Sequence, residues 1–177
     1  MQERPIVYLL AKCLWRRGYE FELEDQKHDL SLNNKRIEFK FNYALCEKAL
    51  KKELVQYGDN LKGMWELVQA RKISRTRGVM ARIYEDVCVK KPRIFVWIVC
   101  SRDLSKVAPR DLKRIIHGPA QFKYNAAHPY SSSGKLPMVA DFLNKLQSIR
   151  PFSLLEEDIQ TNGDFPATYH FRICYFV

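Results

Sequence analysis

Residues 28–41 read HDLSLNNKRIEFKF, two short runs of alternating character on either side of an Asn-Asn pair. Asparagine tolerates positive φ, so Asn33-Asn34 is predicted to form the two-residue loop of a β-hairpin. Side chains alternate along a strand, which places the apolar residues of the second run on one face and Glu38 with Lys40 on the other. The hairpin therefore fixes which side chains share a face of the predicted sheet.

Pairing around this loop puts Leu30 opposite Ile37 and Asp29 opposite Glu38. Directly opposed carboxylates destabilise a sheet, whereas a divalent cation between them reverses the sign of the interaction. Mg²⁺ favours one or two carboxylates together with phosphate oxygens and water. Lys40 lies on the same face, where it can contact an attacking water or the charge of a transition state. The pattern predicts metal-assisted phosphodiester hydrolysis, with Asp29 and Glu38 as metal ligands and Lys40 as a catalytic residue.

A charged, solvated outer face of a hairpin is the alternative interpretation. Charged residues make up about a quarter of an average protein, so an Asp followed at loose spacing by Glu-x-Lys is common by chance. The context favours the catalytic interpretation, because the Glu-x-Lys lies in an alternating apolar strand directly after a tight turn.

The first 42 residues resemble the PD-(D/E)XK nuclease superfamily, which includes restriction endonucleases and archaeal Holliday-junction resolvases. The likeness rests on a glutamate that opens a helix, a helix exit, and the two strands of the hairpin: Glu3, Gly18-Tyr19-Glu20-Phe21, Asp29-Leu30-Ser31-Leu32-Asn33-Asn34 and Ile37-Glu38-Phe39-Lys40. The resemblance implies metal contact by Asp29 and Glu38, a catalytic role for Lys40 and a supporting role for Glu3. Mg²⁺ or Mn²⁺ is the implied cofactor. His28 stands where the motif has its proline.

The rest of the chain predicts a single α/β domain with a mixed central sheet flanked by helices. The predicted elements are a helix from Pro5 to Gly18, a strand over 19–24, helices within 44–72 divided at Gly58-Asp59 with Asp59 as the second N-cap, a basic connector over 71–93, a buried strand over 93–100, a short helix over 109–117, a loop over 118–135, a helix over 136–149, a second loop, and a strand over 168–177.

The charge balance indicates a polyanionic partner. The chain has 30 Lys and Arg against 20 Asp and Glu, a net charge of +10, and such a field attracts nucleic acid. The candidate phosphate contacts are Arg71, Lys72, Arg75, Arg77, Arg82, Arg110, Lys113 and Arg114. DNA is expected rather than RNA, with a homodimer as the working assembly. A nucleic-acid-binding protein that keeps this fold without cleaving, or a protein that binds an acidic protein, remains an alternative.

The five cysteines show no CxxC spacing and no histidine pair at zinc-finger spacing, which argues against a structural zinc site and for a reducing, cytoplasmic environment. They are predicted to be small core residues, and the three tryptophans are predicted to be core residues as well. No apolar run reaches membrane-spanning length, so the protein is expected to be soluble.

Overall fold

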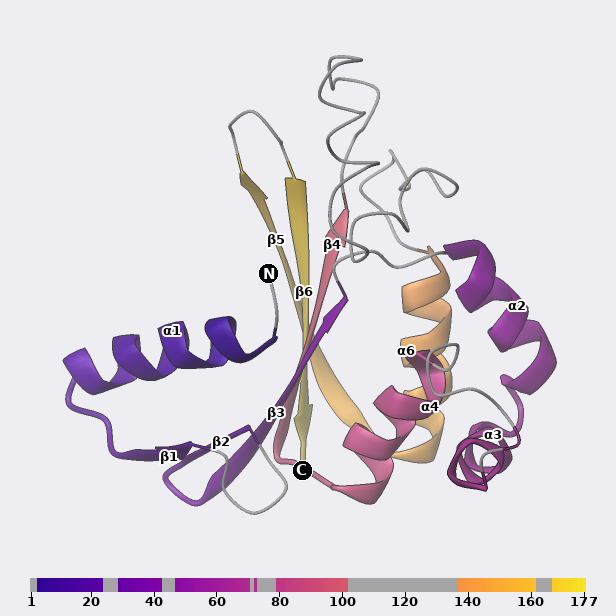
Figure 1. The fold of residues 1–177 in the computed structure, drawn as a ribbon, viewed down its shortest axis with the longest axis horizontal. Coiled ribbons are helices and arrows are strands. Elements are labelled where there is room, and N and C mark those ends of the chain that lie inside the picture. Colours follow the sequence, from indigo (N-terminus) through magenta and orange to yellow (C-terminus); the bar gives the residue numbers. More distant parts are fainter. Residues whose placement is uncertain are drawn as a thin grey trace.

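In the computed structural model, the described residues are 3–23, 29–42, 47–70, 72, 79–101, 137–161 and 167–177. They form a single α/β domain around a six-stranded mixed sheet with strand order β1-β2-β3-β4-β6-β5 (Figure 1). The strands are β1 (Phe21–Leu23), β2 (Leu30–Leu32), β3 (Lys35–Asn42), β4 (Ile94–Ser101), β5 (Phe152–Thr161) and β6 (Ala167–Phe176). The helices are α1 (Glu3–Arg16), α2 (Glu47–Tyr57), α3 (Leu61–Gln69), α4 (Val79–Tyr84), the π-helix η1 (Glu85–Val89) and α6 (Pro137–Ile149). The predicted fold class is confirmed.

The Asn-Asn hairpin forms as the sequence predicts. Asn33 and Asn34 have φ angles of 49° and 61°, the left-handed pair that a two-residue type I′ loop requires. The register pairs Leu30 with Ile37, again as predicted. However, β2 begins at Leu30, so Asp29 lies just outside the antiparallel ladder.

Strand β3 lies between an antiparallel neighbour, β2, and a parallel one, β4. A parallel pair needs a long crossover connection, and the chain between these two strands contains α2, α3, α4 and η1. Strand β4 pairs with β6 on its other side, and β5 forms the edge. Residues 95–100 of β4 are all buried, as the sequence predicts for a central strand.

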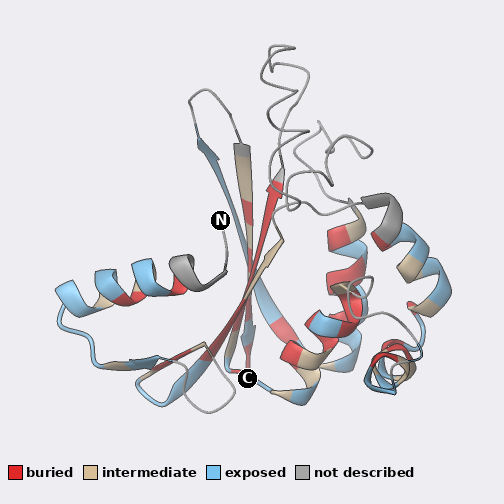
Figure 2. Cartoon of the chain, in the orientation of Figure 1, coloured by how far each residue is buried: buried red, intermediate tan, exposed pale blue. Residues whose placement is uncertain are grey.

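The sheet separates two hydrophobic clusters. Helix α1 covers one face, where Val7 packs with Leu30, Ile37 and Phe39. The other helices lie on the opposite side (Figure 1). There the larger cluster contains Trp97 and buried residues of α3, α4 and α6, and buried positions line both the sheet and the inner sides of α4 and α6 (Figure 2). Side chains on this second face of β3 are therefore enclosed between sheet and helices.

Two predictions of secondary structure are wrong. Residues 79–89 of the predicted basic connector form α4 and η1, because Met80, Ile83, Tyr84 and Val87 recur at helical spacing and are buried. Residues 152–161 of the predicted second loop form β5. This edge strand is mostly exposed and polar, so it lacks the apolar alternation that identifies a strand.

Three side chains also differ from their predicted roles. The N-cap of α3 is Asn60, whose side chain accepts a hydrogen bond from Gly63 N at 2.8 Å, rather than Asp59. Trp15 was predicted to be in the core, yet it is 73% exposed. Cys13 is exposed as well, whereas Cys100 and Cys174 are buried as predicted. The predicted helix over 109–117 and loop over 118–135 lie outside the described residues. No helix of the described ranges is long and apolar enough to span a membrane.

Two tryptophans provide a matched test of the core. Trp97 is 0% exposed and its Nε1 donates to Asn42 Oδ1 at 2.7 Å. Trp97→Ala is expected to lower the free energy of unfolding by about 3–5 kcal/mol, because it leaves a large cavity. Trp15→Ala, at the exposed tryptophan, is expected to change it by less than about 0.5 kcal/mol. Urea denaturation checks both values, and equal losses would contradict the described packing.

Candidate active site between the sheet and the π-helix

Glu38 and Lys40 project from the same face of β3, as alternation predicts. In the parallel register Glu38 lies beside Phe95 and Lys40 beside Trp97, both of which belong to the core on the helical side of the sheet. Glu38 is consequently 2% exposed. A carboxyl group this deeply buried keeps a negative charge only with partners that compensate it.

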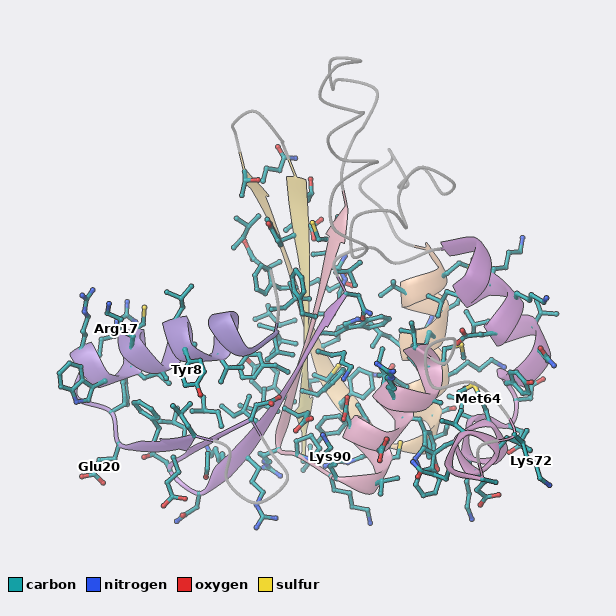
Figure 3. All side chains as sticks on the ribbon, viewed as in Figure 1. Tyr8, Arg17, Glu20, Met64, Lys72 and Lys90 are labelled. Carbon is teal, nitrogen blue, oxygen red and sulfur yellow. The ribbon has the colours of Figure 1, made fainter. Side chains whose placement is uncertain are left out.

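The π-helix supplies those partners. Lys90, the residue directly after η1, contacts Glu38 Oε1 through its Nζ, and the same Nζ lies 2.8 Å from Asp86 Oδ1. Lys40 Nζ lies 3.1 Å from Asp86 Oδ2. The four side chains thus alternate in charge, with two contributed by β3 and two by the segment before β4. Figure 3 shows Lys90 at the lower end of the gap between sheet and helical layer.

The main chain around Lys90 is held in place by Arg150. Its guanidinium donates to Val87 O at 2.6 Å and to Pro92 O at 2.8 Å, and it lies 3.7 Å from the ring centroid of Phe176. Lys91 adopts the left-handed region, with φ 55°, a conformation that costs a non-glycine residue about 1–2 kcal/mol. These contacts end η1 abruptly and turn the chain into β4. π-helical turns are rare and occur frequently at functional sites.

Asp29 was expected to pair with Glu38 across the hairpin, but its side chain instead binds the main chain of β3. Main-chain hydrogen bonds of an antiparallel pair recur at every second residue, so beyond Ile37 the next N–H of β3 that faces β2 is that of Phe39. Because β2 begins at Leu30, the Asp29 side chain accepts this bond instead, with Phe39 N 2.8 Å from Asp29 Oδ2. The negative charge of Asp29 nevertheless acts on Glu38 and raises its pKa.

Burial opposes ionisation of Glu38 more strongly than its lysine partner favours it. The pKa of Glu38 is raised from 4.5 to about 8, chiefly by burial; the hydrogen bond from Lys90 lowers it by less, and the charges of Asp86 and Asp29 add to the rise. For Lys90, burial lowers the pKa, but its hydrogen bonds to Asp86 and Glu38 outweigh burial and raise it above the ordinary value. A cation beside Glu38 therefore favours the ionised form of this carboxyl group.

The donor set fits a hard divalent cation. Glu38 Oε1 and Asp86 Oδ1 both contact the one ammonium of Lys90, so two carboxylate oxygens from separate elements converge on a single cation position. Mg²⁺ binds in proteins through one or two carboxylates, with water and phosphate oxygens as its other ligands. Among the residues that the structure describes, no three His, Cys, Asp or Glu side chains form a group that could hold a metal ion.

The structure does not bring the other predicted site residues into contact with Glu38 and Lys40 within the described ranges. Glu3 is the first residue of α1, its side chain is not among those described, and α1 packs on the opposite face of the sheet. Of the predicted phosphate contacts, Lys72 and Arg82 are exposed, and Lys72 lies at the outer edge of the helical layer, far from Lys90 in the view of Figure 3. The others, Arg71, Arg75, Arg77, Arg110, Lys113 and Arg114, lie outside the described residues.

Sequence reasoning missed Asp86, and it gave Lys90 only as part of a basic connector that could contact phosphates, not as a partner of Glu38. The spacing of Asp86 and Lys90, four residues on a helix, is a recognisable ion-pair signal. In the sequence, however, both lie in a run of basic residues that was interpreted as a connector.

Sequence reasoning also missed a second cluster on the same face, where the buried His170 and Arg172 contact the exposed Asp158. His170 Nδ1 lies 2.9 Å from Asp158 Oδ1, and Arg172 Nη1 lies 3.1 Å from that oxygen. Asp158 belongs to the strand that was predicted to be a loop.

Comparison with protein-family models, with curated proteins and with solved structures found no match to this chain.

The raised pKa of Glu38 predicts a pH dependence of stability. In the unfolded chain Glu38 loses its proton near pH 4.5, whereas in the folded protein it does so near 8. Between these values the folded state binds more protons, so the free energy of unfolding falls as pH rises. Glu38→Gln removes this titration and should flatten that fall, measured by urea denaturation in EDTA.

Glu66→Gln is the matched control, because Glu66 is exposed and forms only a 3.8 Å ion pair with Lys62. This variant should keep the slope of the parent. If Glu38→Gln also keeps the parent slope, Glu38 does not titrate in the folded protein as described.

Proposed function

We propose that the chain is a metal-dependent endonuclease that hydrolyses phosphodiester bonds of nucleic acid, as its resemblance to the PD-(D/E)XK nucleases implies. One observation carries the proposal. Two buried carboxylates, Glu38 and Asp86, each direct one oxygen at the same cation position. The ammonium of Lys40 lies 3.1 Å from the other oxygen of Asp86. Buried groups of this kind are costly for stability alone, which favours a functional reason for keeping them.

Each side chain has a role in this proposal. Glu38 and Asp86 would hold Mg²⁺ or Mn²⁺, and Asp29 adds negative charge beside Glu38. When bound, the metal lowers the pKa of a water molecule and polarises the phosphate. Lys40 donates a hydrogen bond to the attacking water or to a phosphate oxygen and stabilises the charge of the transition state. The Lys40 and Lys90 side chains are 19% and 25% exposed, so substrate reaches the site from the side of the two ammonium groups.

The partner in this proposal is nucleic acid, DNA rather than RNA. The support is the net charge of +10, which brings a polyanion to the protein and makes its affinity dependent on salt. The proposed assembly is a homodimer that acts on two strands. The proposed environment is the reducing cytoplasm, and it is supported by the described cysteines Cys13, Cys88, Cys100 and Cys174, which are free thiols.

A cleavage assay tests the proposal. Duplex, junction, flap and single-stranded substrates of DNA and RNA are incubated with Mg²⁺ or Mn²⁺, and with EDTA as a blank. Asp29→Asn, Asp86→Asn and Lys40→Ala should each lower the cleavage rate by a factor on the order of 100 or more. Asp86→Asn removes a proposed metal ligand, Asp29→Asn removes the negative charge beside Glu38, and Lys40→Ala removes the ammonium that stabilises the transition state. Asp29→Asn keeps a carbonyl oxygen that can accept the bond from Phe39 N.

Two controls separate catalysis from folding and from binding. Lys62→Ala removes an exposed lysine with a weak ion pair and should cut at the parental rate. The three site variants should still bind DNA in a gel-shift assay without metal. Parental cleavage by Asp86→Asn and Lys40→Ala would refute the assignment, and binding without cleavage by the parent would favour a nucleic-acid-binding protein instead.

A further inference from the structure

Lys90 is the side chain of the candidate site that the proposed reaction does not use. Its ammonium contacts Glu38 Oε1 and lies 2.8 Å from Asp86 Oδ1. These are the two oxygens that converge on one cation position. A metal ion held by both oxygens would coincide with the ammonium, so the two cations cannot occupy the site together.

The main chain and the side chain of Lys90 differ in freedom. The carbonyls of Val87 and Pro92, on either side of it, accept hydrogen bonds from Arg150, and Arg93 N donates to Arg36 O at 2.8 Å. The backbone position is therefore fixed. The side chain is long, flexible and 25% exposed, so its charged end can reach solvent by rotation about its own bonds.

The burial of the two carboxyl groups explains why a cation beside them matters before any metal arrives, since it favours their ionised forms. Glu38 and Asp86 are 2% and 4% exposed, and removing the partner of a buried charge is strongly destabilising. Lys40 lies 3.1 Å from the other oxygen of Asp86. Lys90 is thus the side chain that contacts both carboxylates at once.

We propose that Lys90 is an internal counter-cation, which occupies the metal position between Glu38 and Asp86 in the metal-free protein and swings out when a divalent cation binds. The inference rests on the proposed function, since it assumes that these carboxylates hold a metal. It assigns to Lys90 two effects: the metal-free site is stabilised, and metal affinity is lowered because binding has to break two ion pairs.

Mn²⁺ titration by isothermal calorimetry tests the second effect. Lys90→Met keeps the length and apolar body of the side chain but removes its charge. It should bind Mn²⁺ about tenfold more tightly than the parent, because binding no longer has to break the two ion pairs of Lys90; changes next to metal ligands alter affinity by about this factor or more. Its melting temperature should be lower than that of the parent in EDTA and should rise more on addition of Mn²⁺. Lys91→Met removes the same charge one residue along, at an exposed position, and should leave the affinity unchanged.

Lysine acylation of the unmodified protein tests the displacement itself. An ammonium held by two carboxylates reacts slowly with an N-hydroxysuccinimide ester, whereas a solvated lysine reacts readily. Mass spectrometry after a short pulse at fixed pH should find Lys90 protected in EDTA and modified several-fold more in saturating Mn²⁺, relative to Lys91 as the internal reference. This measurement decides the question even if Lys90→Met does not fold.

The outcomes separate this inference from the proposed function. Tighter Mn²⁺ binding by Lys90→Met, or metal-induced exposure of Lys90, supports it. If the parent binds Mn²⁺ and cleaves while Lys90 stays protected and its removal leaves affinity unchanged, the inference is wrong and the nuclease proposal stands. If neither the parent nor Lys90→Met binds Mn²⁺, both are overturned.

Discussion

Two carboxylates, those of Glu38 and Asp86, are buried within reach of one ammonium group, and their need for a cation between them governs the arrangement around the site. Buried charges are tolerated only when they are paired and hydrogen-bonded. Here the pairing is supplied by Lys90 and Lys40, one from each of the two elements that carry the carboxylates. The hydrophobic cluster on this face holds the two elements together, and the alternation of charge lets them carry buried carboxylates.

The topology of the sheet makes the encounter possible. Because β3 and β4 are parallel, the chain has to cross over between them, and the last element of that crossover is η1. Its end is determined by a left-handed residue, Lys91, and by the hydrogen bonds of Arg150 to two carbonyls. The crossover thereby returns Asp86 and Lys90 to the face of β3 that carries Glu38. The other face is committed to packing against α1.

The hairpin and half of the candidate site could be predicted from local sequence. Turn chemistry at Asn33-Asn34 and alternation along β3 are short-range signals, and they give the register and the shared face of Glu38 and Lys40 correctly. The position of Asp86 depends on a crossover about fifty residues long, which no local pattern specifies. Asp29 illustrates the same limit. It would pair with Glu38 across the hairpin only if β2 began before Leu30, and β2 begins at Leu30. The edge strand β5 could not be predicted, because exposed, acidic residues such as Glu156 and Glu157 interrupt the alternation of apolar and polar residues that identifies a strand.

Crystallography with Mn²⁺ can show whether a metal ion replaces the ammonium of Lys90, because anomalous scattering locates the ion without reference to activity. We expect one peak within coordination distance of Glu38 and Asp86, about 2.2 Å, at the position that Lys90 Nζ occupies in the metal-free protein, with the Lys90 side chain turned to solvent. A crystal in saturating Mn²⁺ that shows no peak between these carboxylates, with Lys90 still in contact with both, would contradict this expectation.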